Sequence, residues 1–572
     1  MVLARPFFER TAQRARDIQF LIPKVTKNHN RLTVQAWKHD LVAGFLVFLI
    51  ALPLCLGISL ASGFPAVAGI LTAIVGGILT PFFSNSELTI KGPAAGLIVI
   101  VLGCITDFGF TLGQNPSADL EAYRLALGVG IAAAVLQILF GFLRSGVLVE
   151  VFPIASVHGM LTAIGIIIIA RQLPVTLGVR AQGSPLDLLL HVPTHIRNLN
   201  PEIALIGSLS LFILFGFPLI RNRYVQLLPA PLLVLLIAVP LGNSFDLAHE
   251  HTYSLMGNSY SLGGKYLVSV PYNLFRAITF PDFHGLATLK AWKWVALYAL
   301  IGSLESLLSA KAIDLLDPWK RKTNLDRDLV AVGIGNLFSA FLGGLPMISE
   351  IVRSRANIDN GARTRLSNMA HGLILLLAVV LFARVMHHIP LAALAAMLVY
   401  TGFRLAHPRE FVRVFRVGPD QFFIYLGTIV AVLMTDLLIG VFVGVGLTIL
   451  FHLCHGLPFR KLFQSSIRLE PKEEKHCYII PQTAAVFSHW ISLKKFIERH
   501  GIAQRCNVVI DLSEADLIDH TVMENLHQME RDFKRQELDL RVTGLERHVG
   551  LSDHPLATRR KRRTELKESE SH

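Results

Sequence analysis

Glu305 is the residue whose chemistry is hardest to explain as packing alone. It lies in the middle of an otherwise apolar stretch, Leu300–Ser309. An acid at the centre of a bilayer costs about 2.5–3.5 kcal/mol on insertion scales, so such residues are usually functional. We interpret Glu305 as the group that binds a coupling proton or Na⁺, or that repels an anion when ionised. A structural role stays open, in which it pairs with Arg353 or accepts hydrogen bonds from Ser306 and Ser309.

Arg353 and Glu350 form a second charged group inside apolar sequence. They follow Gly343-Gly344-Leu345-Pro346 within the run Met347–Arg353. An earlier stretch resembles this arrangement: the polar run 84–91 leads into Gly-Pro-Ala-Ala-Gly at 92–96 and then a short apolar segment. Both patterns predict an extended strand followed by a half-helix that begins inside the membrane. Such backbone is tolerated at that depth only where it lines a protein-enclosed or watery cavity.

Two half-helices that begin near the middle of the membrane can hold an anion. Each helix start carries about half a positive charge and unsatisfied N–H donors. Arg353, one to two turns into the second half-helix, adds a formal charge. The alternatives are ordinary Gly/Pro kinks in packed spans, and an arginine that reaches out to lipid headgroups. The matching positions of the two interruptions favour a transport site.

The elements that must position these residues are membrane spans. The chain of 572 residues is 52% apolar and only 17% charged, with a mean hydropathy of +0.51. Soluble proteins carry about 25% charged residues. Much of the net charge of +13 lies in short segments between apolar runs, which is the positive-inside pattern and excludes nucleic acid as the partner. The first 35 residues are a basic arm without the apolar core of a signal peptide.

Fourteen apolar segments are predicted between residues 36 and 460. The first seven are near 41–60, 65–83, 92–105, 122–142, 153–170, 201–219 and 229–241, and the second seven near 291–310, 327–343, 348–358, 366–384, 389–404, 418–434 and 436–456. A polar stretch, 243–290, separates them. Because seven is an odd number of spans, the second set starts on the opposite side of the membrane from the first. The two sets are therefore oppositely oriented, as in an inverted repeat. The basic loops then place both termini in the cytoplasm.

Catalytic and metal-binding patterns are missing from the sequence. The five cysteines show no metal-ligand spacing, and no Ser/His/Asp or phosphate-loop arrangement is present. We therefore expect reduced thiols, no metal, no cofactor other than a coupling ion, and no enzyme activity. A membrane enzyme or receptor whose output is the soluble tail is the alternative from another functional class.

Several motifs together resemble the sulfate permease (SulP) family. They are Asp40–Gly44, Ala51–Gly57, Ala61–Gly63, Gly92–Gly96, Ser303–Leu308, Arg353–Asn357 and Asn360–Thr364. The resemblance covers residues 36 to 457 and is closest to the bacterial branch that includes members fused to carbonic anhydrase, although no enzyme is fused here. It implies an all-α domain of core and gate bundles, an elevator-like mechanism, a homodimer and a bacterial inner membrane location. Sulfate, bicarbonate, chloride and carboxylates are the implied substrates.

The same resemblance assigns the pocket by position. In the family the anion lies between the third and tenth helices, and the first and eighth helices line it. The substrate-binding positions become Leu54, Cys55, Pro93, Ala94, Ala95, Ile348, Ser349, Glu350 and Arg353, and Glu305 and Ser309 become the coupling-ion positions. Na⁺-coupled bicarbonate members have an acid and a hydroxyl at the latter two places. Glu replaces Asp here, so Na⁺ and H⁺ are equal candidates.

A small α/β domain follows the membrane region. The apolar strand Cys506–Leu512, a helix opening near Asp519 and the strand Leu538–Leu545 indicate this fold. It resembles the STAS domain of the same family, and the resemblance implies that a cytosolic regulator binds to it. Thr521 is interpreted as a helix N-cap rather than a phosphorylation site. The predicted boundaries are a linker at 461–474, the STAS-like domain at 475–550 and a basic, disordered tail at 551–572.

The prediction is therefore a secondary transporter of small inorganic anions, with bicarbonate favoured over sulfate because an ionised Glu305 would disfavour a dianion. A nucleobase or dicarboxylate permease of the same fold and a channel-like anion conductor are the alternatives. Nucleobases need acids and amides as hydrogen-bonding partners, and Glu305 and Glu350 keep that alternative open.

Overall fold

The structure is a computed structural model, and its folded residues fall into two compact units. It describes residues 34–146, 152–179, 181, 183–220, 229–255, 257–269, 277–319, 321–435, 437–471 and 476–562. The first unit comprises residues 1–146 and 167–402, and the second comprises 147–166 and 403–572. The charge-rich arm at 1–33 and Asp436, between the last two spans, lie outside the described residues.

The predicted segments of the first half all correspond to helices or to a strand followed by a helix. They are α2 (Val34–Ala61), α3 (Ala66–Ile78) with α4 (Thr80–Phe83), β1 (Ile90–Pro93) with η1 (Ala95–Leu97) and α5 (Ile98–Asp107), α6 (Pro116–Phe142), α7 (Ile154–Thr176), α10 (Pro201–Gly216) and α11 (Ala230–Ser244). Asn115 and Asn200 cap α6 and α10 by accepting a backbone N–H three residues later, and a proline follows each cap. Polar caps and proline at the first helical position satisfy or remove N–H groups that a helix start leaves open.

The second half repeats this order, with one additional short helix, α17 (Pro408–Val417), between its fifth and sixth predicted segments. Its elements are α12 (Leu289–Leu316), α13 (Leu325–Phe341), β4 (Met347–Glu350) with α14 (Ile351–Asp359), α15 (Leu366–Met386), α16 (Leu391–Leu405), α17, α18 (Pro419–Met434) and α19 (Leu437–Cys454). In each half the third element is a short strand followed by a short helix, as the sequence predicted. Six helices of the described part are long and apolar enough to cross a membrane. The predicted membrane fold of two repeated halves is confirmed.

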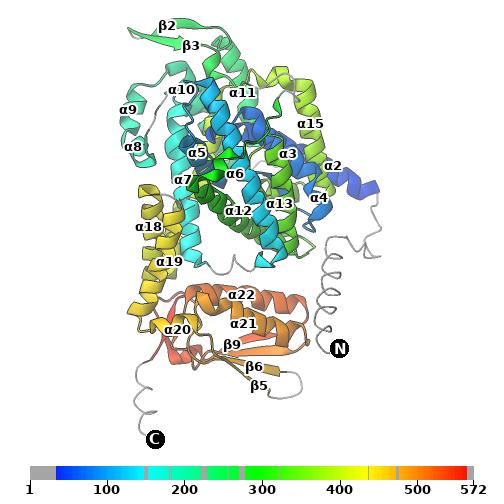
Figure 1. The fold of residues 1–572 in the computed structure, drawn as a ribbon, viewed down its shortest axis with the longest axis vertical. Coiled ribbons are helices and arrows are strands. Elements are labelled where there is room, and N and C mark those ends of the chain that lie inside the picture. Colours follow the sequence, from blue (N-terminus) through cyan, green and yellow to red (C-terminus); the bar gives the residue numbers. More distant parts are fainter. Residues whose placement is uncertain are drawn as a thin grey trace. The chain divides into compact units, whose positions relative to one another are not determined.

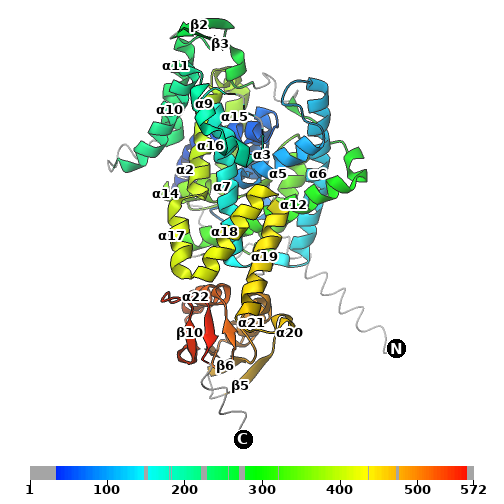
Figure 2. The ribbon, with the colours of Figure 1, turned by 90° about the vertical axis from the view of Figure 1, so that its left-hand side faces the viewer.

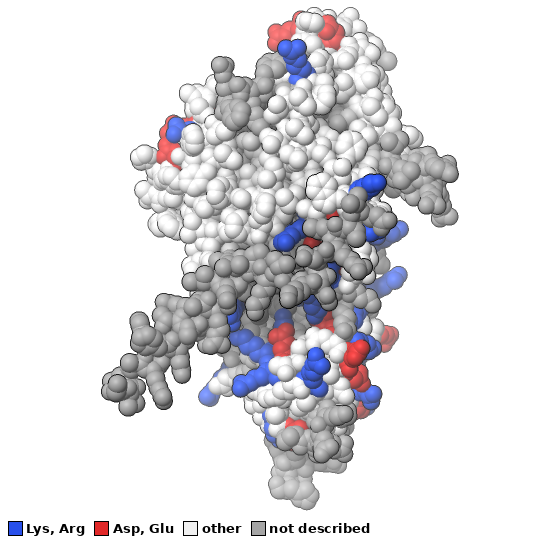
Figure 3. Space-filling model, turned by 90° about the vertical axis from the view of Figure 1, so that its right-hand side faces the viewer, with Lys and Arg blue, Asp and Glu red and all other residues white. Residues whose placement is uncertain are grey.

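In the first unit, α6 packs along α13, α12 against α6, and α15 against α2 and α3 (Figure 1). The face in Figure 3 shows the helices of this unit almost without charged side chains, as a lipid-facing surface requires. The polar stretch between the halves contains the hairpin of β2 (His251–Leu255) and β3 (Asn258–Leu262) (Figure 2). The rings of Tyr253 and Tyr260 stack across it, with their centroids 5.4 Å apart.

The two interrupted segments meet in an antiparallel two-stranded ladder, β1–β4. The register pairs Ile90 with Glu350, Lys91 with Ser349, Gly92 with Ile348 and Pro93 with Met347. Every residue of both strands is buried. Unpaired backbone groups inside a membrane each cost several kcal/mol, and the ladder satisfies those of both irregular segments at once. The half-helices α5 and α14 therefore start from one shared structure.

The soluble part of the second unit is a small α/β domain. Its main sheet has the order β5 (Ile467–Pro471), β6 (His476–Pro481), β7 (Asn507–Asp511) and β9 (Leu540–Thr543), and all but the first pair of neighbours are parallel. The helices α21 (Trp490–Ile497) and α22 (His520–Arg535) pack on it around a core that includes Trp490, Ile510 and Phe533. This architecture is consistent with the predicted STAS-like domain.

Two predicted boundaries of this domain differ from the structure. Strand β5 lies inside the predicted linker 461–474, because Ile467 and Leu469 pack against the core. The predicted disordered tail begins too early. Residues 551–562 are folded and contain β11 (Arg559–Lys561), which pairs with β10 (His548–Gly550) and with β8 (Leu517–Ile518). Composition alone suggested disorder, since a basic run resembles a solvated tail, whereas here its backbone completes a second sheet.

Candidate functional site: the starts of two half-helices

Arg353 lies at the centre of the candidate site. It is on α14, is 1% exposed and does not reach toward a membrane surface, which excludes the alternative of an arginine paired with lipid headgroups. Its Nη1 donates to the Sγ of Cys55 on α2 at 3.5 Å, and its Nη2 donates to the carbonyl oxygen of Pro93 on β1 at 3.3 Å. Its Nε has no hydrogen-bond partner among the described residues. A guanidinium with a free donor in a buried position is prepared to bind an acceptor.

Glu350 and Glu305 approach the start of the first half-helix from two other elements. The Glu350 carboxyl faces the backbone N–H of Ala95, the first residue of η1. Glu305, on α12, lies against Gly96. One carboxyl oxygen of each acid is shielded from solvent and lacks a partner among the described residues. The site therefore contains two acids and one base, and the structure records no ion pair between Glu305 and Arg353 in its described part.

The Gly-Pro-Ala-Ala-Gly motif is explained by these two charged side chains. A Cβ at Gly92 would overlap Nη1 of Arg353, and a Cβ at Gly96 would overlap the carboxyl group of Glu305. Each glycine thus leaves room for one charged group to approach the backbone of the first half-helix. Pro93 ends the strand, and its carbonyl binds the guanidinium. The two glycines of this motif are therefore needed because they lack side chains, and not because they make the backbone flexible.

Replacing Gly96 by alanine is expected to displace the Glu305 carboxyl group, because the new methyl group needs the space that the carboxyl occupies. Overpacking of this kind costs about 1–3 kcal/mol. We expect a lower thermal unfolding temperature in detergent and reduced anion uptake by liposomes. Gly446→Ala on α19 is the matched control, since nothing lies within 4 Å of its Cβ position. Equal stability and uptake in the two variants would contradict the Gly96–Glu305 contact.

The remaining predicted site residues lie on the same elements. Ala94 donates its backbone N–H to the carbonyl oxygen of Pro346 at 3.3 Å, and Ile348 belongs to the ladder opposite Gly92. Leu54 precedes Cys55 on α2, and Ser309 is buried one turn after Glu305 on α12. The recorded contacts join Cys55, Pro93, Ala95, Glu350 and Arg353 directly, and place Glu305 against Gly96. None of them joins Leu54 or Ser309 to this group within the described residues.

Ser349 belongs to a buried network that the sequence did not reveal. Lys91 donates to both carboxylate oxygens of Asp328 on α13, at 2.6 and 2.7 Å, and to the hydroxyl of Ser349. Ser306 and Ser84 extend the network by further hydrogen bonds. The exposed fraction of both charged side chains is 1%. This ion pair ties β1, β4 and α13 together directly behind the starts of the half-helices.

His371, on α15, was also missed. It is fully buried, neither ring nitrogen has a hydrogen-bond partner among the described residues, and it interacts electrostatically with Arg353. A lone histidine in the apolar run 366–386 carries no spacing signal, so sequence reasoning had no means to connect it with residue 353. Its position makes it a further polar group around the guanidinium.

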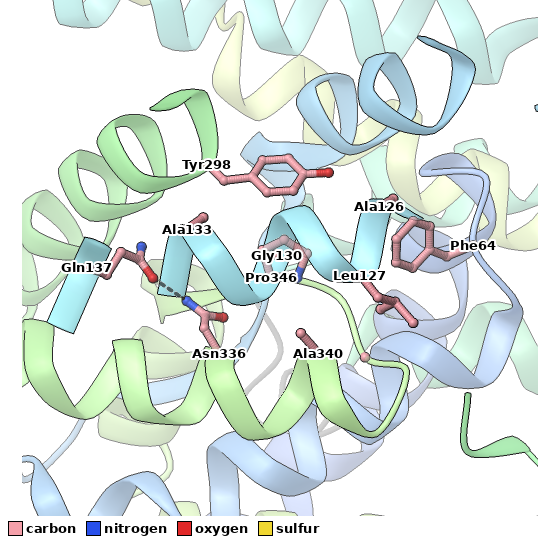
Figure 4. Close-up of a pocket in the computed structure, with 11 residues that line it drawn as sticks. Phe64, Ala126, Leu127, Gly130, Ala133, Gln137, Tyr298, Asn336, Ala340 and Pro346 are labelled. Carbon is pink, nitrogen blue, oxygen red and sulfur yellow. Dashed lines mark hydrogen bonds between the residues drawn. The ribbon is translucent and has the colours of Figure 1, made fainter. Parts of the chain in front are cut away.

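A separate cavity lies between α6, α12 and α13 and contains no charged residue (Figure 4). Gln137 and Asn336 are joined across it by a hydrogen bond of 2.7 Å. Asn336 also accepts the backbone N–H of Met347 at 2.6 Å and donates to the carbonyl oxygen of that residue at 3.1 Å. These amides support the first residue of β4 from behind. The amides that line this cavity therefore help to hold strand β4 in place. The charged groups described above do not line the cavity.

In the second unit, Asp519 rather than Thr521 caps the helix α22. Its carboxylate accepts the backbone N–H groups of Val522 and Phe487 at 2.8 and 2.6 Å. Burial raises the pKa of Asp519 to about 7, and these hydrogen bonds oppose that shift. Thr521 is 3% exposed, and its hydroxyl accepts the backbone N–H of Ile154 at 3.3 Å. The interpretation of Thr521 as the N-cap was wrong by two residues, because the helix starts at His520.

Comparison with known proteins shows the family to which the chain belongs. The model of the sulfate permease family matches residues 37–428. The putative sulfate transporter YvdB of Bacillus subtilis is 27% identical over 423 residues, covering 73% of this chain and 74% of that protein. The bicarbonate transporter BicA of Picosynechococcus is 25% identical over 417 residues, covering 73% and 70%.

Solved structures show the same fold. The transmembrane domain of a cyanobacterial BicA superimposes with a TM-score of 0.58 at 24% identity, covering 72% of this chain and 98% of that domain. The overall structure of SLC26A9 has a TM-score of 0.67 at 13% identity, covering 95% and 90%. The family match extends over more than half of the chain and includes both half-helices. The chain belongs to the sulfate permease family.

Proposed function

We propose that this chain carries small inorganic anions, bicarbonate or sulfate, across the bacterial inner membrane by secondary active transport. The observation that carries the proposal is the buried Arg353, whose Nε has no partner among the described residues, at the starts of two half-helices joined by one strand ladder. An anion between α5 and α14 would meet the guanidinium and both helix N-termini. The names of the relatives, a putative sulfate transporter and a bicarbonate transporter, support this substrate class.

Bicarbonate is the substrate that the charges of the site favour. It carries one negative charge and sulfate two, and both Glu305 and Glu350 lie at the start of the first half-helix. Like charges repel strongly where little water screens them. A monoanion therefore meets less repulsion, and its hydroxyl can donate a hydrogen bond to a carboxylate, which sulfate cannot do.

Glu305 is proposed as the coupling group. Its Oε2, which has no partner in the part of the chain that the structure describes, can take a proton. It can instead bind Na⁺ together with the hydroxyl of Ser309 one turn away, since Na⁺ is a hard cation that prefers oxygen ligands. Either ion would cancel the charge of Glu305 and lower the repulsion toward the anion. Transport would then proceed by elevator-like movement of the core bundle in a homodimer, with both termini in the cytoplasm and the STAS-like domain binding a regulator.

The test is uptake of labelled bicarbonate and of labelled sulfate by liposomes that contain the purified protein, under an imposed Na⁺ gradient or an imposed H⁺ gradient. We expect one anion to accumulate with one of the gradients. Glu305→Gln is expected to abolish the dependence on that gradient, because the amide neither ionises nor binds a proton. Glu121→Gln, which changes an exposed acid on α6, is the control and should behave as the unmodified protein does.

Two results would reject parts of this proposal separately. Retained gradient dependence in Glu305→Gln would remove Glu305 from the coupling step. Failure of both anions to move under every gradient, with a protein that remains folded, would reject inorganic anions as substrates, and nucleobases and dicarboxylates would be tested next.

A further inference from the structure

Glu350 connects the two half-helices in an unusual way. Its backbone is the N-cap of α14, with φ −94° and ψ 118°, but its side chain does not cap that helix. The carboxyl group instead faces the backbone N–H of Ala95, at the start of the other half-helix. The residue is 9% exposed, and its Oε1 has no hydrogen-bond partner among the described residues.

The carboxylate of Glu350 therefore occupies a position that suits a bound anion. The N-terminus of a helix attracts negative charge through its free N–H groups, whether the charge is on a side chain or on a ligand. Arg353, one turn further along α14, attracts both in the same way, and it interacts electrostatically with Glu350. An ionised Glu350 and a transported anion would compete for the Ala95 N–H and for the guanidinium.

The charge balance of the site leads to the same conclusion. With Glu305 and Glu350 ionised and Arg353 protonated, the three groups sum to one negative charge, and an added monoanion would bring the site to two. Two acids that interact in a buried site resist being ionised together. If one carboxylate takes a proton from water as the monoanion arrives, an O–H bond forms on that carboxylate and the total charge of the site does not change.

We propose that Glu350 is a built-in competitor of the transported anion: its carboxylate holds the start of the first half-helix in the unloaded site, and it must be protonated to give that place to a monoanion. The proposal rests on the proposed function. It means that anion binding requires a proton on Glu350, in addition to any coupling ion at Glu305. It also gives selectivity, because a single proton compensates a monoanion fully and a dianion only in part.

Titratable and charged groups surround Glu350 on each packed element. Those that interact with Glu350 itself are Arg353 on α14, Glu305 on α12 and Cys55 on α2. His371 on α15 interacts with Arg353, and the Lys91–Asp328 pair lies behind the adjacent Ser349. Lys91 and Asp328 neutralise each other. Glu305 is therefore the group whose titration must be separated from that of Glu350, and single variants of each acid achieve this.

The experiment is calorimetric titration of the purified protein with chloride and with sulfate, whose charges stay constant near neutral pH. Two buffers of different ionisation enthalpy give the number of protons taken up per anion bound. For the unmodified protein we expect uptake of about one proton per chloride, and affinity that falls about tenfold per pH unit above the pKa of the acid. Glu350→Gln should bind chloride at high pH at least about tenfold more tightly, with proton uptake reduced and the remaining pH dependence due to Glu305.

Three outcomes would overturn the proposal. They are Glu350→Gln with weaker anion binding, Glu350→Gln with unchanged proton uptake, and an effect equal to that of the control Glu121→Gln. Glu350→Asp is the second variant, in case the amide impairs folding. Its shorter carboxylate keeps the charge but withdraws from Ala95, so chloride should bind more tightly than to the unmodified protein while proton uptake persists; weaker binding here counts against the proposal in the same way.

If no anion binds to any variant, the proposed function fails. Infrared spectroscopy of the protein without anion then tests whether Glu350 takes up a proton. On acidification we expect a protonated-carboxyl band that is present in Glu305→Gln and missing in Glu350→Gln. An identical band in these two variants would show that Glu350 does not take up the proton, and would reject the inference independently of transport.

Discussion

Replacing Arg353 by glutamine is expected to reduce anion transport by about 100-fold or more. The substitution removes the positive charge that interacts with Glu350, together with the donors to Cys55 and Pro93. Removing one charged partner of a buried, bound group costs about 2–5 kcal/mol of binding free energy, and about 1.4 kcal/mol corresponds to a factor of ten in affinity. Initial rates of labelled bicarbonate and sulfate uptake by liposomes measure the effect.

Arg355→Gln is the matched control on the same helix. Arg355 is half exposed and pairs with Asp359 at 3.2 Å, so its loss leaves no buried charge without a partner. We expect at most a small change in uptake. Arg353→Lys separates charge from shape, since lysine keeps the charge but cannot donate to two acceptors in a fixed plane. Uptake by Arg353→Gln at the level of Arg355→Gln would mean that the guanidinium does not bind the anion.

Replacing Lys91 by methionine is expected to destabilise the protein by about 3–5 kcal/mol, because it leaves the carboxylate of Asp328 buried without its cation. The double variant Lys91→Met/Asp328→Asn has no unpaired buried charge, so it should be more stable than either single variant. Thermal unfolding in detergent and the yield of folded protein measure these differences.

Lys461→Met is the control for this prediction. Lys461 and Asp516 form the same kind of ion pair at 2.9 Å, but both side chains are about 40% exposed. Water can solvate an exposed partner that is left alone, so the expected loss is below about 1 kcal/mol. A Lys91→Met protein as stable as Lys461→Met would show that the buried pair does not hold β1, β4 and α13 together.

The sequence predicted the backbone of the site better than its side-chain contacts. A polar run ending in Gly-Pro, and Gly-Gly-Leu-Pro at the corresponding place of the second half, predicted a strand and a half-helix in both places, and the structure contains β1 with α5 and β4 with α14. Helix-breaking residues act locally, and the repeat supplied a second, independent instance. The assignment of Glu305, Ser309 and Arg353 to coupling and binding stays a prediction.

Contacts between distant segments were beyond the sequence. Lys91 was noted only as part of a polar run, although its partner Asp328 lies on a helix of the other half. In the sequence, the two glycines of the first motif predicted only a break in a helix. In the structure, Gly92 leaves room for the side chain of Arg353 and Gly96 leaves room for that of Glu305, and both side chains come from other elements. His371 gave no signal, since one histidine in an apolar helix has no periodicity. Each of these contacts depends on which helices become neighbours in the folded protein. The sequence around any one of these residues does not indicate its neighbours.

The β1–β4 ladder has a consequence for how the molecule is made. It pairs Pro93 with Met347, residues about 250 positions apart, so the two repeats complete each other's backbone hydrogen bonds. While the chain is being synthesised, the first strand must wait in the bilayer for a partner that emerges only after most of the membrane domain. Neither repeat can therefore complete its fold alone: the first half to be inserted keeps unpaired backbone groups until the second half supplies its strand.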